Sequence, residues 1–158
     1  MNHLTKIVLL SVLQLSVYAA AAAPYKTIGP ARVFETPGTF AETKENLILA
    51  IENEGMVISY TSHASKMLAR TAKAAGVTTA VYNDAEIVFF CKAELSHALV
   101  QANPHNLVLC PYSIAIYTLT NEKNRVYLSI RDPYSKEPHL DPITQMVLNI
   151  IKTTQNGF

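Results

Sequence analysis

The sequence lacks the motifs that mark several common enzyme classes. It contains no tryptophan and only five glycines, and those glycines form no cluster. A phosphate-binding loop needs closely spaced glycines and a serine hydrolase elbow needs G-x-S-x-G, and the chain has neither pattern. It also has no acidic cluster of the kind that binds calcium or magnesium. The sequence therefore predicts no catalytic residue and assigns no cofactor.

An excess of charge of either sign is also absent. The chain has 13 lysines and arginines against 12 aspartates and glutamates, a formal net charge of +1. Lys6 is the only one of these charged residues among the first 22, so the remainder of the chain is neutral. A neutral chain lacks the basic surface of a nucleic-acid-binding protein and gives no reason to expect an anionic membrane. The predicted partner is a small molecule or a protein.

The first 22 residues differ in composition from the rest. A short segment with one lysine precedes an uncharged apolar run at 7–18 and a tract of small residues at 19–23. This order is typical of a secretory signal peptide, and the run is shorter than the roughly 20 apolar residues of a membrane span. Ala20 and Ala22 fit the small residues before a cleavage site. We predict a cleaved signal peptide at 1–22 and a periplasmic or secreted protein without stable membrane insertion; an uncleaved anchor is the alternative.

Capping signals predict where the helices begin and end. Thr39 and Glu42 have the spacing of a capping box, in which each side chain binds a free backbone amide of the other. Gly55 supplies a left-handed stop, so a helix is predicted over 40–54. A second helix is predicted over 62–75 with a narrow buried stripe. The residues expected in this stripe are Met67, Leu68, Thr71 and Ala75.

Strand patterns between these helices predict the fold class. Pro111 lies inside the longest β-like stretch, 106–119, where it marks an edge, a bulge or a break. A polar turn then predicts an antiparallel hairpin with a strand at 125–131. The predicted fold is α+β, a two-layer sandwich with helices on one face of a small mixed sheet. The other predicted elements are strands at 31–36, 56–60 and 86–91 and helices at 93–102 and from 141. A lead-in segment at 23–38, which contains the first of these strands, precedes a single domain over 39–156.

Several segments carry a resemblance to a known family. They are Thr39-Phe40, Gly55, the segments 63–71, 85–91 and 94–97, and above all Asn103-Pro104-His105-Asn106-Leu107-Val108-Leu109-Cys110-Pro111-Tyr112. On these residues the chain resembles the bacterial domain-of-unknown-function family 302 (DUF302) over about 40–133. The resemblance implies a small α+β domain that pairs as a homodimer, and it implies no activity.

Cys91, His97, His105 and Cys110 are the candidate metal ligands of the sequence. Thiolates and imidazoles bind zinc, copper(I) and haem iron. The spacings match no standard zinc motif, and CxxC and CxxCH are absent. In an oxidising compartment, two cysteines first suggest a disulfide. Three interpretations stay open: a disulfide or two structural thiols, a metal or haem site, and a redox-active pair.

His63, Arg70 and Tyr112 are the candidate ligand-binding residues. Histidine side chains in general titrate near neutral pH, so a base at His63 is one interpretation, although a helix-start residue that hydrogen-bonds locally is the simpler one. The guanidinium of Arg70 can bind an anion, although such an arginine more often lies on the solvated face or pairs with a nearby acid such as Glu86. Tyr112 belongs to a group near the hairpin that can line a pocket, form a dimer surface or pack on the sheet. The other members are Tyr117, Tyr127 and Tyr134.

These observations lead to three hypotheses of different kinds. The first is an exported, dimeric, non-enzymatic module that binds a small ligand, a metal or a partner protein. The second is a redox or metal- or haem-handling accessory protein that uses Cys91 and Cys110. The third is a hydrolase, which would need His63 or His97 beside a nucleophile that the sequence does not identify.

Overall fold

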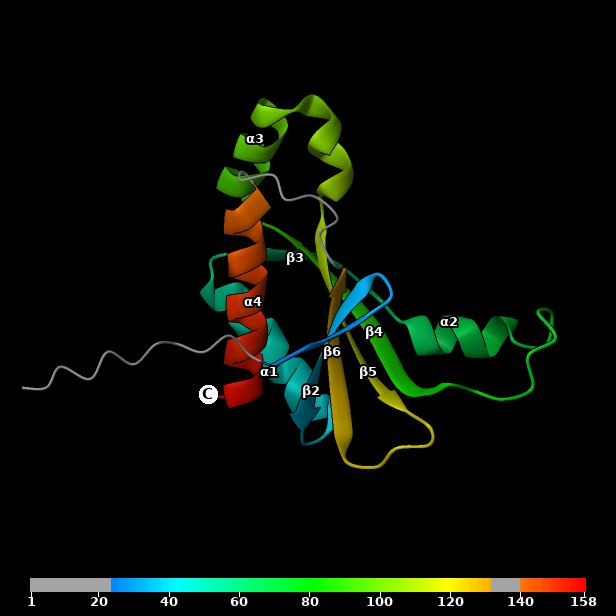
Figure 1. Cartoon of the computed structure of the whole chain (residues 1–158). Coiled ribbons are helices and arrows are strands. Elements are labelled where there is room, and N and C mark those ends of the chain that lie inside the picture. Colours follow the sequence, from blue (N-terminus) through cyan, green and yellow to red (C-terminus); the bar gives the residue numbers. More distant parts are fainter. Residues whose placement is uncertain (1–23, 132–139) are drawn as a thin grey trace, which may run out of the picture.

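The computed structural model describes residues 24–131 and 140–158. In chain order, its elements are β1 (Lys26–Ile28), β2 (Ala31–Pro37), α1 (Phe40–Asn53), β3 (Val57–Ser62), α2 (Ala64–Thr71), β4 (Tyr82–Cys91), α3 (Ala93–Ala102), the 3-10 helix η1 (Pro104–Leu109), β5 (Tyr112–Leu119), β6 (Arg125–Arg131) and α4 (Asp141–Asn156). The six strands form one open sheet in the order β1-β2-β6-β5-β4-β3 (Figure 1). The predicted α+β class and the hairpin between β5 and β6 are confirmed.

Helices α1 and α4 cover one face of the sheet and lie against each other (Figure 1). The core forms between these helices and alternate residues of the central strands. Burial of these side chains is the main force that holds the two layers together. The fully buried members of the core include Phe34, Val88, Phe90, Ile114, Ile116 and Leu128 from the sheet and Leu47, Ile51, Ile150 and Ile151 from the helices.

The predicted capping box opens α1. The Glu42 amide donates to the Thr39 hydroxyl at 3.2 Å, and the Thr39 amide donates to the Glu42 carboxylate at 3.2 Å. Gly55 follows the helix with a φ of 73°, the left-handed conformation expected at a helix end. The helix covers Phe40–Asn53, so its predicted bounds are confirmed to within one residue.

The sheet is antiparallel throughout, and the prediction of a mixed sheet was wrong. Parallel neighbours need a crossover helix that packs on the sheet. Instead, α2 projects from the sheet, and α3 with η1 extends beyond the strand ends (Figure 1). The chain therefore reverses direction between β3 and β4 and again between β4 and β5.

The predicted buried stripe of α2 was also wrong. All four of its residues are exposed, including Met67 at 44% and Leu68 at 45%. The apolar periodicity was read correctly as helical, but α2 projects from the sheet and contacts β4 without burying this stripe. Periodicity predicts an amphipathic helix and does not predict what covers its apolar side.

The long strand predicted over 106–119 is divided. Residues 104–109 form η1, because the Asn103 side chain accepts a hydrogen bond from the His105 amide at 2.9 Å and Pro104 occupies the first turn. Strand β5 begins at Tyr112, directly after Pro111, which cannot donate to the ladder. Cys110 therefore lies between η1 and β5, and not in mid-strand as expected.

No helix of the described ranges is long and apolar enough to cross a membrane. The predicted signal peptide at 1–22 and Tyr134 lie outside the described residues.

Candidate functional site

Cys91 and Cys110 meet where β4 ends and β5 begins. Phe90 pairs with Tyr112 in the β4–β5 register, so the residues just beyond this pair are neighbours across the ladder. The two side chains interact with each other, and both are partly buried free thiols. No disulfide joins them. The chain reversal through α3 and η1 thus brings together two thiols that are about twenty residues apart in sequence.

Two hydroxyl groups flank the thiols. The hydroxyl of Ser96, in the first turn of α3, lies 3.1 Å from the Cys110 sulfur. Ser59 of β3 lies on the Cys91 side, where its hydroxyl donates to the Phe89 carbonyl at 3.2 Å and also acts on the Cys91 thiol. Elements β3, β4, α3 and the start of β5 therefore all contribute to this group.

Tyr112 completes the group from the core side. The residue is 5% exposed, and its ring packs against Phe90 with the centroids 6.3 Å apart. Its hydroxyl is buried and makes no hydrogen bond of good geometry among the described residues, although the Ser96 hydroxyl and the Cys110 thiol lie close enough to act on it. Burial raises the pKa of Tyr112 to about 12 against an opposite effect of Ser96, and the two thiols act in the same direction as burial. A buried polar group whose hydrogen bond is poorly formed is a place to look for an unseen ligand.

We call Cys91, Cys110, Ser96 and Tyr112 the thiol cluster. Burial raises the pKa of the Cys91 thiol, and the neighbouring Cys110 raises it further, against a smaller opposite effect of Ser59. The protonated thiol is therefore the dominant form of Cys91 at neutral pH. Such a thiol is a poor nucleophile, whereas a metal ion can still displace its proton and bind the thiolate.

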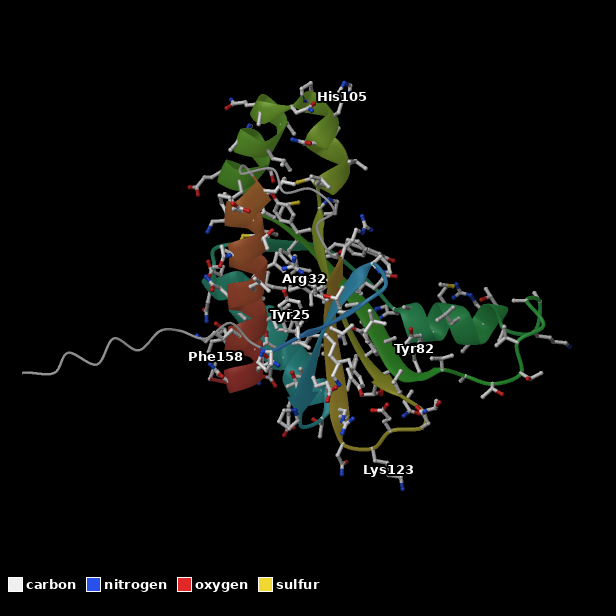
Figure 2. All side chains as sticks on the ribbon, viewed as in Figure 1. Tyr25, Arg32, Tyr82, His105, Lys123 and Phe158 are labelled. Atoms are coloured by element: carbon white, nitrogen blue, oxygen red, sulfur yellow. The ribbon has the colours of Figure 1, made fainter. Side chains whose placement is uncertain are left out.

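His97 and His105 do not join the thiols. Both are exposed, and Figure 2 shows His105 at the outer tip of the α3–η1 region. Within 24–131 and 140–158, no group of three or more histidines, cysteines or acids could hold a metal ion. Successive residues of a helix point about 100° apart, so the helix turn that directs Ser96 toward Cys110 directs His97 elsewhere. The structure thus brings together two of the four candidate metal ligands.

His63 belongs to a separate group of residues, which forms around Glu86 of β4. Its Nδ1 lies 3.0 Å from Glu86 Oε1, and the Lys44 Nζ lies 2.7 Å from Glu86 Oε2. We call these three residues the Glu86 cluster. Burial raises the pKa of Glu86, but the interactions with Lys44 and His63 outweigh burial, so this pKa is lowered overall. His63 precedes α2 as predicted, yet its partner is distant in sequence and is not the backbone of its own helix.

Arg70 lies exposed on α2. Of its two simpler interpretations, this position agrees with the solvated face and not with a pair to Glu86, whose carboxylate oxygens face Lys44 from α1 and His63. Tyr82, Tyr117 and Tyr127 form a ladder across β4, β5 and β6 on the face opposite the helices. Tyr117 stacks on Tyr127 at 5.3 Å, and Tyr82 meets Tyr117 edge-on at 5.4 Å. Tyr112 is separate from them, because it faces the core.

A shallow pocket lies between the start of α1 and the end of α4. Its lining includes Thr36, Glu42, Asn46 and Gln155, and it contains no thiol or imidazole. Glu42 is already engaged in the capping box of α1. We therefore place the candidate site at the thiol cluster.

Sequence reasoning missed Ser96, Ser59 and Lys44. No motif marks them, because their roles depend on the pairing of β4 with β5 and on the position of α1 and α3 against β4. The one available signal was the predicted strand–helix–strand unit around the two cysteines, which places the first residues of its helix near both strands.

Comparisons with known proteins agree with the fold. A crystal structure of an uncharacterized conserved protein DUF302 from Bacillus stearothermophilus resembles the chain with a TM-score of 0.61 and 13% sequence identity. The similarity covers 82% of this chain and 98% of that one, and at this identity it supports the fold alone. No curated protein matches the chain. The family described as domain of unknown function DUF302 matches residues 33–154. The chain therefore belongs to the DUF302 family.

Proposed function

We propose that this domain is a non-enzymatic binding module and that the thiol cluster is its binding site. The observation that carries the proposal is the pair of neighbouring free thiols, Cys91 and Cys110, beside a buried Tyr112 hydroxyl that makes no hydrogen bond of good geometry among the described residues. A ligand held by the thiols would give this hydroxyl a better-placed partner.

A catalytic role for the cluster is less consistent with its chemistry. A nucleophilic cysteine needs a lowered pKa or a base within hydrogen-bond reach. The pKa of Cys91 is raised, and the group that lies 3.1 Å from the Cys110 sulfur is the Ser96 hydroxyl, which is not a base. These features favour binding over thiol catalysis.

A purely structural role also explains the cluster poorly. If the site served only packing, phenylalanine at position 112 would fill the core without burying a hydroxyl that makes no hydrogen bond of good geometry among the described residues. Free cysteines commonly behave as small apolar residues, which would account for either thiol alone. It would not account for two thiols and two hydroxyls gathered from β4, α3 and the start of β5.

A trivalent arsenical tests this proposal, because arsenic(III) bonds to two thiols that lie close together. Phenylarsine oxide should form one adduct per chain with the reduced protein, with two As–S bonds formed and one water released. Intact mass measured under native conditions should show this adduct for the wild type and for His97→Ala, which is the matched control. Cys91→Ser and Cys110→Ser should each abolish it. Failure to label the wild type, or unchanged labelling of both serine variants, would contradict the proposal.

We also propose that two copies of the chain pair through the β3 edge. Strand β3 has a sheet neighbour on one side only, and it exposes Val57 at 76% and Tyr60 at 64%. An uncovered edge strand can hydrogen-bond to the same edge of a second copy, and an apolar edge left open favours aggregation. The wild type should have the mass of a dimer by light scattering, and Val57→Lys should reduce it to a monomer. A monomeric wild type would contradict this proposal.

The export proposal rests on the sequence of the first 22 residues. Expression of the full chain in a bacterium with a periplasm should yield a protein that has lost about 22 residues. Intact mass of the periplasmic fraction measures this directly. A full-length mass in the cytosolic fraction would contradict the proposal.

A further inference from the structure

We infer that the thiol cluster binds one copper(I) ion through the thiolates of Cys91 and Cys110. The inference rests on the proposed function, since it names the ligand of the same site. It goes further by deriving the class of ion from the donor set and by giving roles to the hydroxyl groups of Ser96 and Tyr112.

The donor set selects a soft ion of low coordination number. Cys91 and Cys110 offer two sulfur donors, and no third histidine, cysteine or acid joins them in the part of the chain that the structure describes. Structural zinc needs four ligands, and magnesium and calcium need six or more oxygens. Copper(I) prefers thiolates and, as a closed-shell monovalent ion, is satisfied by two of them in a near-linear arrangement.

The charge that binding creates explains the hydroxyl groups. Each thiol loses one proton as the ion enters, so two thiols and Cu⁺ give a complex of net charge −1 and release two protons. A partly buried anion needs hydrogen-bond donors. The Ser96 hydroxyl already lies 3.1 Å from the Cys110 sulfur, and the Tyr112 hydroxyl, which makes no hydrogen bond of good geometry among the described residues, lies near Cys110. We assign both as donors to the thiolate sulfurs, as is usual for groups that support metal ligands.

A disulfide fits the same pair less well. The cysteines do not lie at disulfide distance, and closing the bond would require the side chains or the backbone to move. Two thiolates that bridge one ion can stay further apart than two bonded sulfurs. The observed arrangement of neighbouring but unbonded thiols therefore favours the ion.

The test is a competition between the reduced, purified protein and a colorimetric copper(I) chelator under anaerobic conditions. The wild type should withdraw one equivalent of copper(I). Cys91→Ser and Cys110→Ser should each lower the affinity at least a hundredfold, whereas Tyr112→Phe should lower it about tenfold. The matched control, His97→Ala with His105→Ala, should bind as the wild type does, and excess zinc should not compete.

Two arms keep the outcome unambiguous. If a serine variant does not fold, wild-type protein alkylated with N-ethylmaleimide replaces it and should bind no copper(I). If phenylarsine oxide labels the wild type but copper(I) does not bind, this inference is wrong and the proposed function stands. If neither binds, both are wrong. Copper(I) binding that persists in both serine variants, or that the two histidine substitutions abolish, would also overturn the inference.

Discussion

Strand β4 carries residues of two polar clusters that differ in the interactions that hold their groups. In the Glu86 cluster, Lys44 and His63 lie at 2.7 and 3.0 Å from the two carboxylate oxygens, although the Lys44 contact is an ion pair outside good hydrogen-bond geometry. The thiol cluster consists of thiols and hydroxyls, and its Tyr112 hydroxyl makes no hydrogen bond of good geometry among the described residues. The Glu86 cluster, held by an ion pair, is suited to joining α1 and the start of α2 to the sheet. The thiol cluster, held by weaker contacts, is suited to receiving a ligand.

The difference teaches that polarity alone does not identify a binding site. Both clusters are partly buried, and both draw on elements that are distant in sequence. What separates them is that an ion pair holds the Glu86 carboxylate, whereas thiols and hydroxyls hold one another in the thiol cluster. If this account is correct, substitutions in the Glu86 cluster change stability and substitutions in the thiol cluster change binding.

The largest expected effect is the loss of ligand binding in Cys110→Ser. The substitution keeps the size of the side chain and removes one of two thiolate donors, so the copper(I) affinity should fall at least a hundredfold. The free energy of unfolding should change by less than about 1 kcal/mol, because the side chain is only partly buried. Chelator competition and urea denaturation on one preparation measure both quantities. A large loss of stability with little loss of copper(I) affinity would show that Cys110 stabilises the fold and does not bind the ligand.

Glu86→Gln should have the opposite pattern. It should destabilise the fold by about 2 kcal/mol at neutral pH, between the effects of an exposed and a fully buried ion pair, because the Glu86 side chain is 12% exposed. Copper(I) affinity should not change. Urea denaturation of the variant and the wild type measures the difference in stability.

The pH dependence of this difference has a definite sign. The pKa of Glu86 is lowered in the folded protein, so its contribution is fully present above the ordinary carboxyl pKa and is lost as the pH falls through the folded value. The difference in the free energy of unfolding between the wild type and Glu86→Gln should therefore be constant near neutral pH. It should shrink toward zero in acid below the ordinary carboxyl range. A difference that grows in acid would show that Glu86 is not held as an ion pair.

Tyr112→Phe should separate copper(I) affinity from the stability of the fold most clearly. The copper(I) affinity should fall about tenfold, because one donor to the thiolates is lost. The stability of the ligand-free protein should stay the same or rise by up to about 1 kcal/mol, because the buried hydroxyl that is removed makes no hydrogen bond of good geometry among the described residues. Thermal unfolding without the ion and chelator competition with it provide the two readouts. A marked loss of stability without the ion would mean that the hydroxyl already has a partner.

The smallest expected effect is that of Arg70→Ala. Arg70 is exposed on α2 and is not a partner of Glu86, so the stability should stay within about 0.5 kcal/mol of the wild type. Lys44→Ala, measured beside it by urea denaturation, should be clearly more destabilising. Equal effects would show that Glu86 does not distinguish between the two cations.

The sequence was sufficient where local signals decide structure. The Thr39–Glu42 capping box, the alternation along β6 and the bounds of α3 were read correctly, because each depends on neighbours within a few residues. It was insufficient for the antiparallel order of the sheet and for the exposed side of α2. Those features depend on whether the helix between two strands packs over the sheet or projects from it, and periodicity is the same in both cases.

The candidate site divides in the same way. Residue type pointed to Cys91, Cys110 and Tyr112 as candidates, and the strand–helix–strand order suggested that the cysteines meet. The sequence grouped His97 and His105 with them because imidazoles are good ligands, but the turn of α3 and the tip of η1 leave both exposed. Ser96 was missed, because only the three-dimensional path of α3 brings its hydroxyl to the Cys110 sulfur.

X-ray absorption at the copper edge of the copper(I)-loaded protein tests the central claim most directly, because it counts and identifies the atoms bound to the ion. The account predicts two sulfur ligands and no nitrogen, with the same spectrum in the His97→Ala, His105→Ala variant. Nitrogen ligands, or sulfur ligands that persist when Cys91 or Cys110 is replaced by serine, would contradict it.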